Sequence, residues 1–212
     1  MLPGPDYVYR CPNCSALASQ SSISSGNTFG AVYWSDAKRE APMLPERPAL
    51  VACPKCETYL WIESLELVGE VDWYHRDSSP AEWAKAPRFR SLDGNDFVRA
   101  LNAGLGDTPE REQYIRVRLW WSLNDAYRKD DAPRGRRDRT FLDNLGRLGL
   151  LLDGSANDTL LRAEIERESS NFQRAIQLCD KLLGMNADRH LIEIATLICA
   201  RAIAKDERVF RR

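Results

Sequence analysis

The chain has 212 residues, of which 43% are hydrophobic and 29% are charged, a composition typical of folded proteins rather than of disordered or membrane-spanning ones. Thirty Lys and Arg residues stand against thirty-one Asp and Glu residues, and the formal net charge of -1 excludes a strong overall attraction to nucleic acid or to an anionic membrane. The length predicts one or two domains.

The strongest pattern in the chain is a repeated pair of cysteines. "CPNC" contains Cys11 and Cys14, and "CPKC" contains Cys53 and Cys56. Two thiolates from one tight turn reach the same ion, and two such turns supply the four tetrahedral ligands of a structural zinc site. We therefore predict that the four cysteines bind one Zn²⁺. Because four protein thiolates leave no open coordination position, we expect this metal to hold the fold rather than to activate a water.

Two other interpretations of the cysteine pairs remain, namely a thioredoxin-like redox site and disulfides. A redox CxxC pair normally opens a helix within a βαβ unit. Here the flanking residues "VYR", "LVA" and "YLW" are typical of short strands, which favours zinc.

The segments around these pairs predict a small antiparallel zinc-ribbon domain over residues 1–72. The Ser-rich stretch 15–27 has no apolar period and predicts a mobile loop. Residues 28–34, "TFGAVYW", alternate like a strand, and three prolines predict extended chain over 35–48. Residues 50–71 are expected to complete the sheet around the metal.

Residues 73–92 predict a connector, because they mix Pro, Ser, charges and aromatic residues without a clean period. Trp73, Tyr74 and Trp83 are its notable side chains, since aromatic residues anchor interfaces as well as cores.

From residue 93 to residue 212 the pattern predicts an α-helical domain of about five helices. The first helix is expected to be capped by Asn95 or Asp96, and the second to begin at Thr108 with Pro109 in its first turn. Cys179 and Cys199 fall within helical patterns, and we interpret both as small core residues. The predicted fold class is therefore α+β, with a zinc ribbon followed by a helical bundle.

The sequence does not predict an enzyme. The chain contains two histidines, His75 and His190, and neither occurs in a pattern with a nucleophile and an acidic partner. Phosphate-binding glycine loops and the HExxH metalloprotease motif are also missing from the sequence.

The segment "LLRAEIERESSNFQRAIQLCDKLL" resembles one tetratricopeptide repeat, with Ala163 in a first helix, a turn at "SSN", and Phe172, Ala175 and Ile176 in a second helix. It departs from the repeat at Thr159, Arg162 and Ala163, where an aromatic residue and a Leu-Gly pair are expected. With the ribbon before it, the chain resembles uncharacterised bacterial proteins that join an N-terminal zinc ribbon to a C-terminal tetratricopeptide-like half. The resemblance implies a helical hairpin, protein binding and a cytoplasmic bacterial setting.

These observations predict a non-catalytic, cytoplasmic zinc protein that acts as a protein-protein interaction module or adaptor, with an unknown protein as partner and no membrane association. The alternative is a nucleic-acid-binding regulatory protein that uses the basic loop 128–139, where Arg134, Arg136 and Arg137 would grip phosphates. The absence of basic excess in the ribbon disfavours that alternative.

Overall fold

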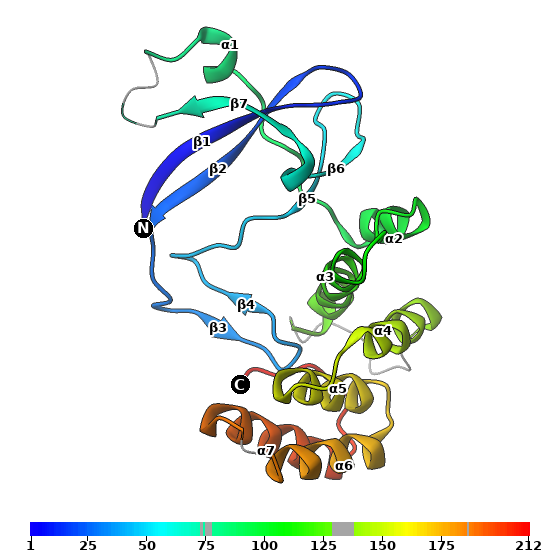
Figure 1. The fold of residues 1–212 in the computed structure, drawn as a ribbon. Helices are drawn as coiled ribbons and strands as arrows, with labels where there is room; N and C mark the ends of the chain where they lie inside the picture. The colour runs from blue at the N-terminus through cyan, green and yellow to red at the C-terminus, as the bar shows by residue number, and fades with distance from the viewer. Residues whose placement is uncertain (73, 75–77, 129–137, 186) are drawn as a thin grey trace. The chain divides into compact units, whose positions relative to one another are not determined.

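The computed structural model describes the chain except for residues 73, 75–77, 129–137 and 186. The described residues form small antiparallel sheets in the N-terminal part and helices in the C-terminal part (Figure 1), so the fold class is α+β. They divide into two compact units. Unit 1 contains residues 1–31 and 40–92, and unit 2 contains residues 32–39 and 93–212.

The main sheet of unit 1 has three antiparallel strands in the order β2-β1-β7. The central strand β1 (Leu2–Arg10) pairs with β2 (Leu17–Ser25) on one side and with β7 (Glu66–Val71) on the other. Val8, which is fully buried, lies opposite Ser19 on β2 and Gly69 on β7.

The prediction of a mobile loop over 15–27 is wrong for most of its length, because β2 occupies it. Ala18 and Ser22 are buried on one face of that strand, and the Ser22 and Ser24 hydroxyls donate to the main-chain oxygens of Pro5 and Pro3 on β1. A serine whose hydroxyl is satisfied by the neighbouring strand packs like a small apolar residue. The alternation of side chains between the two faces of β2 therefore does not appear as an alternation of hydrophobic and polar residues in the sequence.

A second pair of strands in unit 1, β5 (Leu50–Ala52) and β6 (Tyr59–Trp61), forms a hairpin around the second cysteine pair and leads into a short 3₁₀ turn, Ile62–Ser64. Residues 87–90 lie against both sheets, since Arg88 bridges Ser19 on β2 and Arg90 bridges Ala52 on β5. The predicted connector thus contributes its last residues, and the short helix α1 (Ala81–Ala84), to unit 1.

Unit 2 begins with a hairpin from within the predicted ribbon. The strand expected over 28–34 is reduced to β3 (Val32–Tyr33), which pairs with β4 (Arg39–Glu40). Trp34 bridges Arg211, and the Ser35 N–H donates to the Phe210 carbonyl. The hairpin therefore packs with the helical part of the chain and takes no part in the sheet around the cysteines.

The described part of unit 2 also contains six longer helices, which a C-terminal segment follows. The first begins at Asp93, whose carboxylate accepts from the Asp96 N–H in a reciprocal capping box, so the expectation of an Asn95 or Asp96 cap was wrong by two or three residues. Thr108 does accept from the Arg111 N–H, as expected of a helix start. The helices are α2 (Gly94–Asn102), α3 (Pro109–Arg128), α4 (Arg139–Leu151), α5 (Ala156–Glu168), α6 (Phe172–Leu183) and α7 (Arg189–Ile203).

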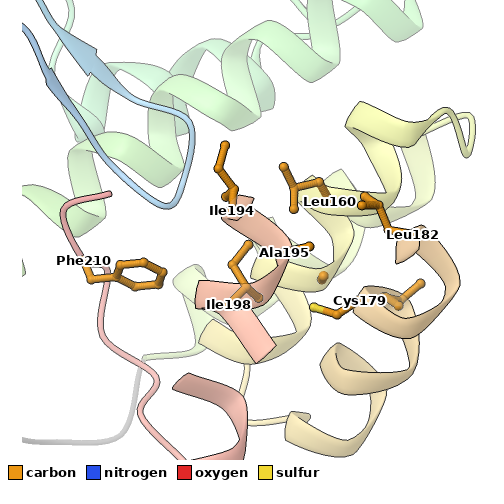
Figure 2. Close-up of a cluster of buried hydrophobic side chains, with 9 residues drawn as sticks. Leu160, Cys179, Leu182, Ile194, Ala195, Ile198 and Phe210 are labelled. Carbon is orange, nitrogen blue, oxygen red and sulfur yellow. The ribbon is translucent and has the colours of Figure 1, made fainter. Parts of the chain in front are cut away.

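The last three helices share a hydrophobic core (Figure 2), in which side chains of α5, α6 and α7 meet Phe210 of the C-terminal segment. Cys179 lies in this core, as predicted, and its burial raises the pKa of the thiol to about 12. The predicted helical hairpin is α5 and α6, which join through a turn at Ser169–Asn171. A separate cluster packs α3 and α4 around Trp120 and Leu145.

Candidate metal centre

Both cysteine pairs lie in turns with the same main-chain geometry. In the first, the Cys11 N–H donates to the Ala16 carbonyl and the Ser15 N–H donates to the Cys11 carbonyl. In the second, Cys53 pairs in the same way with Thr58 and Glu57. Ser15 and Glu57 have positive φ angles of 58° and 59°, a strained region for residues other than glycine. Two turns of one shape therefore present their thiols from the ends of β1 and β5.

The structure brings the four predicted cysteines together. Their Sγ atoms all lie within 4.8 Å of one another. Across the two turns, the Cys11–Cys56 and Cys14–Cys53 sulfur atoms are each 3.7 Å apart. Four ligands at the usual zinc–sulfur bond length of about 2.3 Å, arranged tetrahedrally, would be separated by about 3.8 Å. The thiols therefore fit a single ion of this kind.

The charges of the four thiolates also favour a bound cation. Hydrogen bonds from Thr58 and Asn13 lower the pKa of Cys56 to about 5. A main-chain hydrogen bond near Ala16 acts the same way on Cys14, but desolvation and the three neighbouring thiols outweigh it and raise the Cys14 pKa to about 12. Four thiolates at these distances repel one another strongly, and a divalent metal removes that repulsion.

The surroundings of the cluster are apolar. Cys11 and Cys53 are fully buried, whereas Cys14 and Cys56 are half-buried. The adjoining hydrophobic side chains are Val51, Leu60, Ile62, Leu65 and Phe89. A thiolate cluster within an apolar shell, with all four ligands from the protein, suits a structural metal ion.

The hairpin of unit 2 explains the long separation of the two pairs. Residues 15–52 connect them, and this stretch contains β2 and then the whole excursion 32–39 into unit 2. The extra length is therefore folded chain rather than slack loop, which reduces the entropy cost of closing the site.

The structure describes only some of the other side chains that the sequence singled out. Arg134, Arg136 and Arg137 fall outside the described residues, as does His75. His190 is exposed at the start of α7, where its N–H donates to Asp188. Of the three connector aromatics, Trp73 falls outside the described residues, Tyr74 is exposed, and the Trp83 ring lies against Gly69 of β7.

Sequence reasoning missed a buried group of charged side chains in unit 2. Asp36, at the tip of the hairpin, is fully buried and accepts hydrogen bonds from Asn124 and Arg128 of α3. Glu168 of α5 is also fully buried and accepts from Asn124 and from the Trp120 indole, at 2.9 Å for the indole.

A second buried pair extends this group towards the C-terminal segment. The Arg167 guanidinium forms two hydrogen bonds with Glu164 and also donates to the main-chain oxygens of Asp206 and Arg208. Polar residues of this kind normally predict a solvated surface. Glu164 and Arg167 pair within α5. The local pattern does not show that they are buried, because the main-chain oxygens that Arg167 also binds come from the distant C-terminal segment.

Comparison with known proteins gives no relative on which to rest a function: no family model, no curated protein and no solved structure matches this chain. None of the helices in the described part of the chain is long and apolar enough to cross a membrane.

Proposed function

We propose that the chain is a non-catalytic zinc protein that acts as an adaptor, with a structural Zn²⁺ in unit 1 and a protein-binding face in unit 2. The observation that supports the zinc is the set of 3.7 Å sulfur separations between the two turns, because they match tetrahedral thiolate coordination. Soft thiolate ligands in a tetrahedral set select zinc over magnesium, calcium or manganese.

The role proposed for the ion is to cross-link the two cysteine turns. Besides the cysteines, the buried members of the apolar cluster beside the site are Val51 and Leu60, and so small a cluster provides limited hydrophobic stabilisation. Structural zinc sites contribute about 10 to 16 kcal/mol of apparent binding free energy. The metal is therefore expected to be the largest single source of stability in unit 1.

The proposed adaptor role rests on exposed apolar side chains of the last two helices. Leu183, Leu197 and Ile203 are 49%, 46% and 67% exposed. A groove of about 760 Å³ is lined in part by Phe172, Ile176 and Ile203. Of the three exposed side chains, Ile203 lines this groove, and an exposed apolar side chain in a groove is typical of surfaces that bind other proteins.

An affinity experiment from cell lysate tests the adaptor role. Wild-type protein is used as bait beside Ile203→Asp, which places a charge in the groove, and Leu150→Asp, a matched control on α4 where the side chain is 73% exposed. We expect one protein to be retained by the wild type and by the control but lost by Ile203→Asp, with nuclease having no effect.

Two outcomes would contradict this proposal. Equal retention of the partner by Ile203→Asp and by the wild type would show that the groove is not the binding surface. Retention that disappears on nuclease treatment would favour nucleic acid as the partner, through the basic loop 128–139.

A further inference from the structure

β2 is an edge strand of its sheet. On its outer side the main-chain groups of Ser19 have hydrogen-bond partners, whereas those of the residues after Ser19 have none among the described residues. The Ser19 N–H donates to the Pro87 carbonyl, and the Phe89 N–H donates to the Ser19 carbonyl. Both main-chain groups of Ser19 therefore face away from β1. Because main-chain direction alternates along a strand, those of Ser21 and Ile23 face the same way.

The register supports this direction for both residues. Ser21 lies opposite Asp6 and Ser19 lies opposite Val8 with no irregularity between them. The irregularity between Pro3 and Asp6 adds a residue to β1, not to β2, so the alternation of β2 continues to Ile23.

The chain that occupies this edge at Ser19 leaves it directly afterwards. Arg88 bridges Ser19 in the parallel sense, whereas Arg90 already bridges Ala52 of β5. Residues 88–90 thus diverge from β2, and a fork opens between β2 and the β5 side. A cavity of about 390 Å³ occupies the fork, within the range of pockets that bind ligands.

The far wall of the cavity includes residues 45–48, which lie near β2 but form no strand ladder with it in the described part of the chain. The Gln20 amide donates to the Pro48 carbonyl at 2.8 Å, which fixes the wall beside the strand. Pro45 and Pro48 line the cavity and have no N–H to donate to it. Residues 45–48 therefore cover this side of β2 but leave its outward main-chain N–H and C=O groups after Ser19 without hydrogen-bond partners in the described structure.

The walls combine an apolar interior with a polar rim of both charge signs. Ile23, Val51 and Phe89 supply apolar surface, and the rim includes Arg47 and Arg88 as well as the acidic Asp6 and Glu46. The Ser21 hydroxyl, which also lines the cavity, is buried and has no hydrogen-bond partner among the described residues. A buried hydroxyl without a hydrogen-bond partner is unfavourable.

We propose that the fork binds an extended peptide segment of another protein, which adds as a strand to β2 at Ser21 and Ile23. The outward N–H and C=O groups of these two residues repeat every second residue, about 6.7 Å apart, and an extended polypeptide repeats its own groups at the same interval. Residues 87–89 already use this edge in the same manner at Ser19. The apolar walls favour an apolar side chain in the bound peptide.

The test uses full-length, zinc-loaded protein and an array of acetylated, amidated heptapeptides in which the third and fifth residues vary. We expect a subset with apolar residues at one of these positions to bind. N-methylation of one main-chain nitrogen in a bound peptide should weaken binding about tenfold, the equivalent of one lost hydrogen bond, without changing a side chain. Binding of no peptide, or no effect of N-methylation at any position, would overturn the proposal.

Two variants test the protein side of the pairing. Ser21→Pro removes the outward N–H, and proline is tolerated on an edge strand where that group is not in the ladder. Ser21→Ala keeps the N–H and removes only the unpartnered hydroxyl. We expect about a tenfold loss for proline and no loss for alanine, with zinc content unchanged in both.

Equal binding by Ser21→Pro and Ser21→Ala would overturn the proposal. So would a wild-type dimer in light scattering that Ser21→Pro abolishes, since the edge would then bind a second copy of the chain. Ile203→Asp should bind the peptides normally, which separates this site from the proposed groove of the helical unit.

Discussion

Asp36 and Arg128 form a buried ion pair in which the guanidinium Nη2 lies 2.5 Å from a carboxylate oxygen. The side chains are 0% and 4% exposed, and the pair joins the tip of the β3–β4 hairpin to the end of α3. Removing one partner of a buried pair leaves the other charge without compensation.

We expect Asp36→Ala to lower the free energy of unfolding of unit 2 by about 3 to 5 kcal/mol. Asp125→Ala is the comparison variant, because Asp125 pairs with Arg128 and with Lys38 of the hairpin but is 45% exposed, and exposed pairs contribute at most about 1 kcal/mol each. Urea denaturation followed by helical circular dichroism measures both. Equal losses in the two variants would show that the hairpin is not anchored through Asp36.

Glu112 predicts a dependence of stability on pH. A hydrogen bond from Arg147, aided by Arg116, lowers the pKa of Glu112 to about 2. Since the folded-state pKa is depressed, the ionised carboxylate stabilises the fold above the unfolded pKa of about 4.3, and this contribution is lost as the pH falls towards 2.

Glu112→Gln should therefore be less stable than wild type at pH 7, by up to about 3 kcal/mol, and the difference should shrink between about pH 4.5 and pH 2. Thermal unfolding of both proteins across this range measures it. Glu110→Gln should show a smaller change of the same sign, since the pKa of Glu110 is also lowered, by hydrogen bonds at its own helix start rather than by arginine. A difference that stays constant with pH would contradict the assignment.

Two glycines predict effects of opposite sign. A Cβ at Gly69 would lie 2.1 Å from the Trp83 ring, whereas a Cβ at Gly146 of α4 would meet nothing within 4 Å. Gly69→Ala should destabilise unit 1 by about 1 to 3 kcal/mol through overpacking. Gly146→Ala should stabilise α4 by about 1 kcal/mol, because alanine has the higher helix propensity. Chemical denaturation measures the change in the free energy of unfolding for both variants. If Gly69→Ala left that free energy unchanged, the Trp83 ring would not lie against Gly69.

The sequence predicted best those features whose signal is local. The cysteine spacing was sufficient to group Cys11 with its three partners, because each pair defines its own turn. The helix start at Thr108 and the buried position of Cys179 followed equally well from neighbouring residues.

Features that depend on distant partners were missed. β2 was taken for a loop because the hydroxyls of Ser22 and Ser24 are satisfied only by β1. The hairpin was assigned to the ribbon because the residues around Asp36 do not indicate that Asp36 pairs with Arg128, ninety-two residues further along the chain. Glu168 is hidden for the same reason, since its partners Trp120 and Asn124 belong to another helix.

The central claim, that the four cysteines hold one zinc ion, is tested most directly by native mass spectrometry with elemental analysis of the purified full-length chain. Wild type and Cys199→Ser should each contain one zinc ion per chain, because Cys199 lies outside the cluster. Cys53→Ser should lose it, or hold it much more weakly. A wild-type protein that takes up no zinc, or whose zinc content is unchanged by Cys53→Ser, would contradict the account.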